Sequence, residues 1–191
     1  MERIILTDIP VSYDPEAIAA TAHIRKESDM YEDLEAGAPL AKAAVKARAV
    51  LKQFPVDSAE GDTVTIAGTP FQSKTVCDAV AGQPYVYLGV VSAGEEISAL
   101  DDIEDEIVAY YLETNTLKQA CDATRAYLNE HCGYQNADFF EPGSIADFAI
   151  ENNQTVFTML GTVTEDIGVV LRDSGFMKPT ITLSGIFYDK K

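Results

Sequence analysis

The segment FFEPGSI, residues 139–145, combines residue types that could line a ligand site. Glu141 offers a carboxylate, which can exchange a proton or attract an ammonium or sulfonium group. Gly143 has no side chain, so its main chain can approach a bound molecule, while the two phenylalanines can exclude water. Pro142 followed by Gly143 is also typical of a simple turn between two elements. The segment therefore has two interpretations, a structural turn and a ligand-facing loop.

Few other side chains suggest chemistry. The two histidines, His23 and His131, are too few for a histidine-rich metal site. The cysteines, Cys77, Cys121 and Cys132, lack the short spacing of zinc ligands, so we expect no metal. Carboxylate pairs are abundant in so acidic a chain and are a weak signal for acid–base catalysis. No glycine-rich phosphate loop is present, which argues against nucleotide-dependent catalysis by that route.

The charge of the chain excludes one class of partner. Its 191 residues include 14 Lys and Arg against 31 Asp and Glu, a formal net charge of −17 that repels nucleic acid. No apolar run approaches the roughly 20 residues of a membrane span, and no signal-peptide pattern opens the chain. We therefore expect a cytoplasmic protein with neither a nucleic-acid nor a membrane partner.

Residues 95–106 form an acidic stretch with seven Asp and Glu residues. It could be a solvated helix start or a docking face for a basic partner, and both interpretations stay open. Its acidic residues are Glu95, Glu96, Asp101, Asp102, Glu104, Asp105 and Glu106.

No linker divides the chain, so we expect residues 1–191 to form one unit, with an N-terminal α/β segment at 1–138 and a C-terminal segment at 139–191. Apolar spacing and stop signals predict helices at 13–37, 40–54, 74–82, 115–133 and 146–161. β-rich runs predict strands at 3–10, 61–71, 84–94, 166–174 and 182–189, the last two paired with each other. This order favours an α+β fold with a mixed or antiparallel sheet.

Short motifs from Phe139 to Tyr188 resemble a known family. They follow the pattern of the activation domain of cobalamin-dependent methionine synthase: Arg-x-x-Pro-Gly-Tyr, a helix, then Glu-Ser-x-x-Met-x-Pro-x-x-Ser-Val-Ser-Gly. The resemblance covers about a quarter of the chain and extends only loosely into the first 138 residues. The positions in register are Pro142, Gly143, Asp173, Ser174, Met177, Pro179, Thr180, Ser184 and Gly185.

The resemblance implies a C-shaped α+β domain with a twisted, mainly antiparallel sheet and packed helices. Such a domain binds S-adenosylmethionine and covers a cobalamin that another domain holds. The implied function is reductive reactivation and remethylation of a cobalamin-dependent methyltransferase or corrinoid protein, here acting in trans. No residue is assigned a catalytic role. The implied cofactor-binding residues are those of the turn: Phe139, Phe140, Glu141, Pro142, Gly143 and Ser144.

Two positions depart from the family pattern. Phe139 replaces the arginine and Ser144 replaces the tyrosine, so a bidentate partner for the carboxylate of S-adenosylmethionine is missing. Glu141 and the backbone amides of the turn remain available. One hypothesis is an activation protein, and the alternative is a non-catalytic module that binds a corrinoid protein and has lost S-adenosylmethionine. A third, a hydrolase that uses carboxylates, lacks a poised base.

Overall fold

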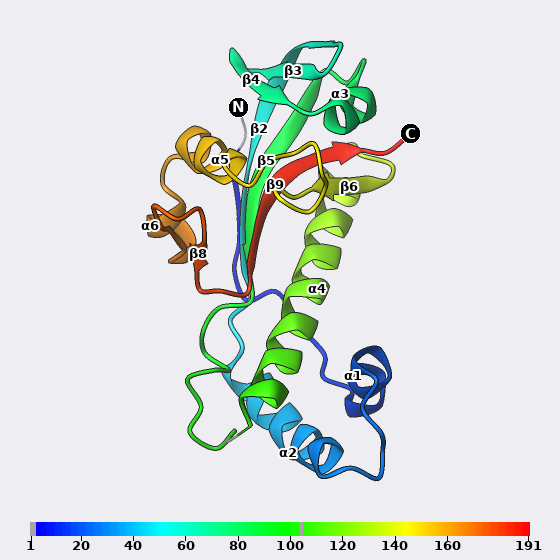
Figure 1. Cartoon of the computed structure of the whole chain (residues 1–191), viewed down its shortest axis with the longest axis vertical. Coiled ribbons are helices and arrows are strands. Elements are labelled where there is room, and N and C mark those ends of the chain that lie inside the picture. The colour runs from blue at the N-terminus through cyan, green and yellow to red at the C-terminus, as the bar shows by residue number, and fades with distance from the viewer. Residues whose placement is uncertain (1–2, 104) are drawn as a thin grey trace.

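The computed structural model describes residues 3–103 and 105–191. Figure 1 shows an elongated molecule in which the sheet fills one half and helices α1 and α2 the other. The helices are α1 (Pro15–Ala22), α2 (Asp29–Ala44), α3 (Lys74–Val80), α4 (Glu106–His131), α5 (Asn152–Leu160) and α6 (Val163–Ile167). The strands are β1 (Arg3–Leu6), β2 (Arg48–Glu60), β3 (Thr63–Ile66), β4 (Thr69–Gln72), β5 (Tyr85–Ser92), β6 (Ala137–Phe140), β7 (Val170–Leu171), β8 (Met177–Lys178) and β9 (Thr182–Asp189).

Seven strands form one antiparallel sheet in the order β4-β3-β2-β5-β9-β6, and β1 pairs with the first half of β2. β7 and β8 form a separate hairpin. The predicted α+β class with a mainly antiparallel sheet is confirmed. The predicted pairing of the last two β-rich runs is wrong, because β9 pairs with β5 and β6 instead.

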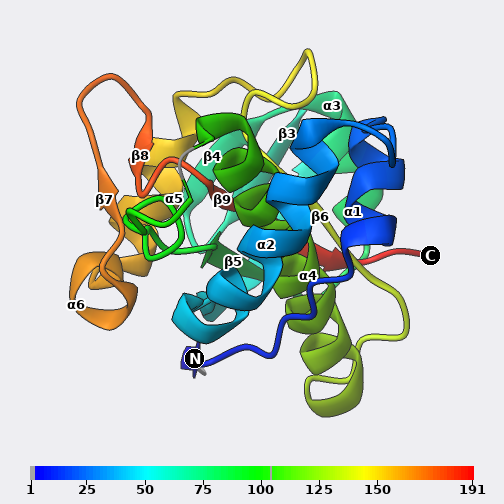
Figure 2. The same ribbon diagram turned by 90° about the horizontal axis from the view of Figure 1, so that it is seen from below.

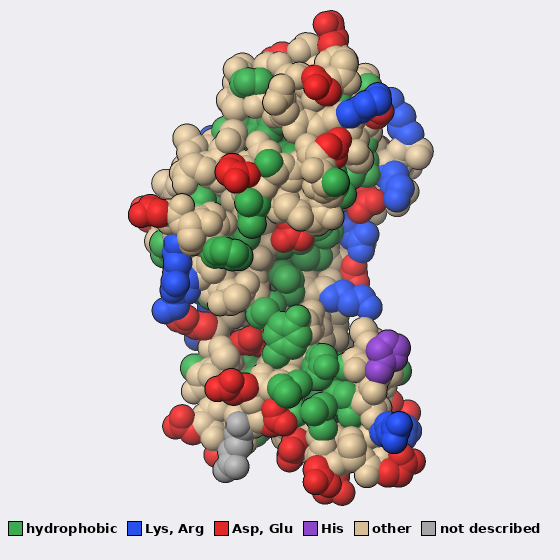
Figure 3. Space-filling model, in the orientation of Figure 1, with side chains coloured by type: hydrophobic (Ala, Val, Ile, Leu, Met, Phe, Trp, Pro, Cys, Tyr) green, Lys and Arg blue, Asp and Glu red, His purple; other side chains and the backbone are tan. Residues whose placement is uncertain are grey.

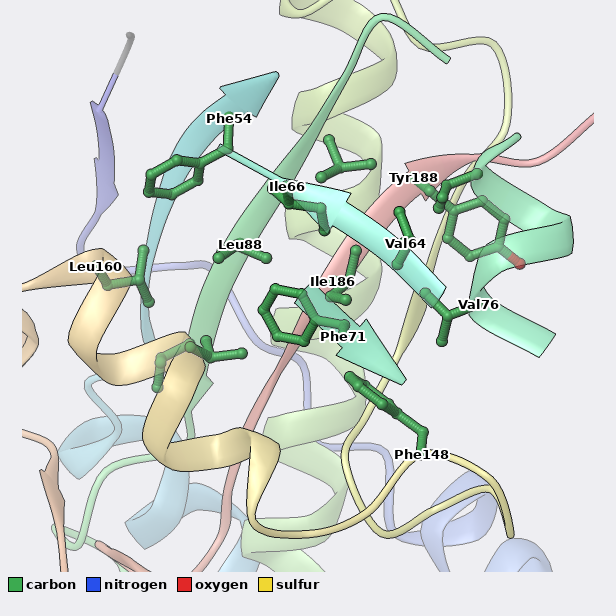
Figure 4. Packing of buried hydrophobic residues seen from close by; sticks show 14 of the residues in the cluster. Phe54, Val64, Ile66, Phe71, Val76, Leu88, Phe148, Leu160, Ile186 and Tyr188 are labelled. Carbon is green, nitrogen blue, oxygen red and sulfur yellow. The ribbon is translucent and has the colours of Figure 1, made fainter. Parts of the chain in front are cut away.

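Helices cover both faces of the sheet. On one face, α3, α5 and α6 enclose a core in which the rings of Phe71 and Phe148 lie 6.3 Å apart, beside Leu88 and Ile186 (Figure 4). On the other face, the C-terminal half of α4 packs against β2, β5 and β9. The N-terminal half of α4 leaves the sheet and packs with α1 and α2 in a third cluster (Figure 2). Because α4 belongs to both halves, it links the sheet to the helical end.

The predicted helix at 40–54 is wrong in its second half. α2 ends at Ala44, and β2 begins at Arg48. Val50 and Leu51 are both fully buried, one in each of the two clusters that flank the sheet. A strand covered on both faces has no alternation of apolar and polar residues, so its spacing can imitate a helix. Pro55, expected as a helix stop, lies in the strand just before a bulge at Val56 and Ser58.

The predicted helix at 13–37 is two helices. α1 ends with His23 in the left-handed conformation, and the Ser28 side chain caps α2. Gly37, expected as a stop, lies inside α2 and is buried against α4. A Cβ there would lie 3.2 Å from Cδ1 of Leu112, so the missing side chain allows the two helices to pack closely.

Gly185 of β9 allows the closest approach of main chains in the sheet half. A Cβ at this position would clash with the carbonyl oxygen of Phe140 on β6. We predict that Gly185→Ala forces β6 and β9 apart and lowers the free energy of unfolding by about 2 kcal/mol, measured by urea denaturation. Gly37→Ala is the comparison, because its nearest neighbour is a side chain and not main chain, and alanine favours a helix, so we expect a smaller loss than at Gly185. Equal effects of the two substitutions would contradict this account.

Candidate functional site

The Pro-Gly segment forms a closed turn at the end of β6. The N–H of Ser144 donates to the carbonyl oxygen of Glu141 at 3.1 Å, and Gly143 has a φ of 87°. Proline second and a left-handed glycine third are typical of a type II turn. The N–H of Gly143 also donates to the carbonyl oxygen of Phe148 at 2.7 Å. Pro142 is buried, whereas Gly143 and Ser144 are exposed, so the corner of the turn is open to a ligand or partner.

Side chains beyond the turn hold it in place. Phe148 is fully buried against Phe71. The Asp147 carboxylate accepts hydrogen bonds from the N–H of Thr75 at 2.9 Å and from its hydroxyl at 3.1 Å. The N–H bond of Thr75 is the main cause that lowers the pKa of Asp147. The turn is therefore supported by the core on one side and by the start of α3 on the other.

Phe139 and Phe140 lie on opposite faces of the sheet. The ring of Phe139 packs 5.3 Å from that of Phe187, in the cluster beneath α4. The ring of Phe140 stacks 4.7 Å from that of Tyr188, in the cluster on the other face. Successive residues of a strand point to opposite faces, so the two rings do not lie on one surface. Phe139 belongs to the face that α4 covers.

Glu141 lies on the same face as Phe139, close to α4. It is half-buried, and loss of water around the carboxylate raises its pKa. Burial also raises the pKa of the Cys121 thiol on α4 to about 12, with smaller contributions from the charges of Asp122 and Glu141. Cys121 is therefore a protonated, unreactive thiol at neutral pH. Sequence reasoning missed the electrostatic influence of Glu141 on Cys121, because only the packing of α4 on the sheet brings the two residues within range of each other.

The remaining residues of the family pattern are divided between two places. Asp173 and Ser174 are exposed between β7 and β8. Ser184 is fully buried in β9, and its hydroxyl donates to Oδ1 of Asn153 at 2.5 Å. Nδ2 of Asn153 in turn donates to the carbonyl oxygen of Gly175 at 3.2 Å. Ser184 and Asn153 therefore join β9, α5 and the β7–β8 hairpin, which is a structural role.

The acidic stretch is only partly a solvated surface. Glu96 forms an ion pair with Arg48, and the Asp105 side chain caps α4 by accepting from the N–H of Ile107 at 2.7 Å. Asp101 and Asp102 are exposed and line a hollow of about 440 Å³ against α2. Glu104, a member of the same run, lies outside the described residues.

No group of three or more His, Cys, Asp or Glu side chains within residues 3–103 and 105–191 is arranged to hold a metal ion. In the same described ranges, no helix combines the length and the apolar character needed to cross a membrane.

Comparison with known proteins identifies the fold. A crystal structure of the MetH reactivation domain bound to AdoHcy superposes with a TM-score of 0.71 and 15% sequence identity. The match covers 100% of this chain and 79% of that domain. No family model matches the chain, and no curated protein matches it. The chain therefore has the fold of the methionine synthase activation domain, and the resemblance found in the C-terminal segment is confirmed at the level of fold.

The raised pKa of Glu141 predicts a pH-dependent stability. In the unfolded chain its pKa returns to about 4.3, so between that value and the higher folded pKa the folded state binds more protons. The contribution of Glu141 is therefore most favourable at low pH and is lost as pH rises through the folded pKa. Glu141→Gln should remove this loss, so that the variant gains stability relative to the wild type as pH rises from about 4 to 7.

Urea denaturation at a series of pH values measures this difference. The matched control is Glu130→Gln, which removes an exposed carboxylate at the end of α4. If the two variants had the same pH dependence, Glu141 would be as well hydrated as a surface residue.

Proposed function

We propose that this protein acts in trans on a cobalamin-dependent methyltransferase or corrinoid protein, as a reactivation partner that covers the cobalamin and presents an S-adenosyl ligand to it. The observation that carries the proposal is the match of the whole chain to a reactivation domain bound to AdoHcy. In such a reaction S-adenosylmethionine would supply the methyl group and leave as S-adenosylhomocysteine, and an external one-electron reductant would supply the electron that a Co(II) cobalamin of the partner needs in order to accept it. The chain itself contributes position and a dry surface.

The turn fits one end of an S-adenosyl ligand better than the other. Glu141 is a half-buried carboxylate without an ion pair among the described residues, which suits the sulfonium or ammonium group. The N–H groups of Gly143 and Ser144 are engaged within the protein, so the groups of this exposed main chain that could meet a ligand are its carbonyl oxygens. The position that carries arginine in the family is occupied by Phe139, whose ring packs against Phe187 and offers nothing to a carboxylate.

Shape supports the covering role. Hydrophobic side chains gather at mid-height on the face shown in Figure 3, where the sheet half meets the helical half. A hollowed surface of this kind can cover a large, flat, apolar macrocycle and exclude water from it. Phe139 lies on the side of the sheet that α4 covers.

A second candidate function is a binding module that caps a corrinoid protein without S-adenosylmethionine. Two contacts favour it. The Phe139 ring is part of the core beneath α4, and the Ser144 hydroxyl donates to the carbonyl oxygen of Glu141 at 2.7 Å. Both side chains that replace the family's ligand-binding residues are thus engaged within the protein.

Calorimetric titration with two related ligands separates the candidates. S-adenosylmethionine carries a positive sulfonium, and S-adenosylhomocysteine carries a neutral sulfur at the same place. If Glu141 faces the sulfonium, Glu141→Gln should weaken S-adenosylmethionine about tenfold, or about 1.4 kcal/mol, and S-adenosylhomocysteine less. Glu130→Gln should change neither. Absence of binding by both ligands to the wild type would support the module instead.

Both candidate functions require the protein to cover the cobalamin of a corrinoid protein. Mixing the protein with a corrinoid protein in its Co(II) state tests this shared requirement. Covering the macrocycle should alter the visible absorption spectrum, because axial ligation of the cobalt changes.

Replacing Asp101 and Asp102 by lysine should weaken the association with the corrinoid protein and flatten its salt dependence, if the two carboxylates face a basic partner surface. The charge-matched control replaces Glu130 and Asp173, which are exposed elsewhere. An unchanged spectrum with every corrinoid protein offered would contradict the proposed function.

A further inference from the structure

A second cavity lies between α4, residues 94–98 and the segment that leads from β8 into β9. Its volume is about 330 Å³, and its walls include Glu95, Ser98, Glu113, Lys178, Pro179 and Ile181. It is separate from the turn at 141–144. Glu113 precedes Cys121, the neighbour of Glu141, by eight residues of α4, which corresponds to about 12 Å along the helix axis.

Glu113 is the unusual residue of this cavity. Its side chain emerges from α4 among buried residues, and only 8% of the residue is exposed. Oε1 accepts one hydrogen bond, from the N–H of Ser98 at 3.2 Å. Among the described residues, Oε2 accepts no hydrogen bond and no cation forms an ion pair with the carboxylate. Oε2 is not one of the fully buried polar atoms without a partner, so it is not sealed from the cavity, and a cation or donor there would stabilise the largely buried carboxylate.

The neighbours of Glu113 do not supply that cation. Nζ of Lys178 lines the same cavity but lies 3.7 Å from Oε2 of Glu95, and both side chains are more than half exposed. The Tyr13 hydroxyl is paired with that of Thr116 at 2.6 Å. Burial raises the pKa of Tyr13 and the charge of Glu113 adds to this rise, so Tyr13 stays neutral. With two carboxylates and one ammonium, the cavity lacks one positive charge.

We propose that this cavity binds a small organic cation with a primary ammonium group. The ammonium lies against Glu113, and a short apolar body lies against Pro179 and Ile181. The volume is at the lower end of the range for ligand pockets, which suits a molecule of a few carbon atoms. A divalent metal does not fit, because no group of three or more His, Cys, Asp or Glu side chains in the described part of the chain is arranged to hold one, and the cavity offers only the carboxylates of Glu95 and Glu113.

NMR titration with n-butylamine hydrochloride tests the site in the intact protein. The amide of Ser98 reports directly, because its N–H donates to Glu113. At about 0.15 M ionic strength and neutral pH, we expect a saturable shift of this amide with n-butylamine and none with n-butanol or butyrate. Glu113→Gln keeps the shape of the side chain and removes its charge, so it should weaken binding tenfold or more. Ile181→Phe fills the cavity and should abolish binding while Glu113 remains.

Two control variants separate this site from other acidic surfaces. Asp102→Asn removes one charge from the neighbouring hollow, and Glu141→Gln removes the carboxylate of the turn. Both should bind n-butylamine as the wild type does. No saturable shift in the wild type, or an undiminished shift in Glu113→Gln, would overturn the proposal. Either result would leave the binding of S-adenosyl ligands at the turn unaffected.

Discussion

Strand β9 passes between β5 and β6 with both faces covered, and it has no room for a side chain at Gly185. Seven of its eight residues are buried, and the carbonyl oxygen of Phe140 occupies the space that a Cβ would need. This contact of main chains fixes β6 against the sheet. Because the turn at 141–144 continues directly from β6, its position depends on the same contact. The hydrogen bond from Ser184 to Asn153 ties the opposite side of β9 to α5.

The turn combines an open corner with a rigid base. Its hydrogen bonds close it on itself, and Phe148 and Asp147 attach it to the core and to α3. A loop of this kind loses little conformational freedom when it meets a ligand or a partner, which favours binding. Its chemistry is limited to one half-buried carboxylate and exposed backbone groups. Phe139 and Ser144, which stand where the family pattern has arginine and tyrosine, both make contacts within the protein.

Helix α4 organises the electrostatics of the molecule. Asp105 caps its start, Glu113 lies in a cavity at its middle, and Cys121 lies beside Glu141 further along. A chain with a net charge of −17 needs most of its carboxylates in water, where they repel one another weakly. Glu113 and Glu141 are both partly withdrawn from water and form no ion pair among the described residues, so each could attract a cation. Glu113 lies on α4 and Glu141 follows β6, so the two carboxylates belong to separate surfaces.

The sequence by itself determined the α+β class, the helix at 74–82, the strand at 84–94 and the turn at Pro142 and Gly143. These features depend on neighbours in the chain, such as a capping side chain or a glycine with a positive φ. Tertiary structure alone decided that β2 is a strand, because both of its faces are covered by distant segments. It also decided that Gly37 packs against Leu112, that Phe140 points away from Phe139, and that Glu113 is buried. Each of these outcomes depends on contacts between residues far apart in the chain, which local spacing does not encode.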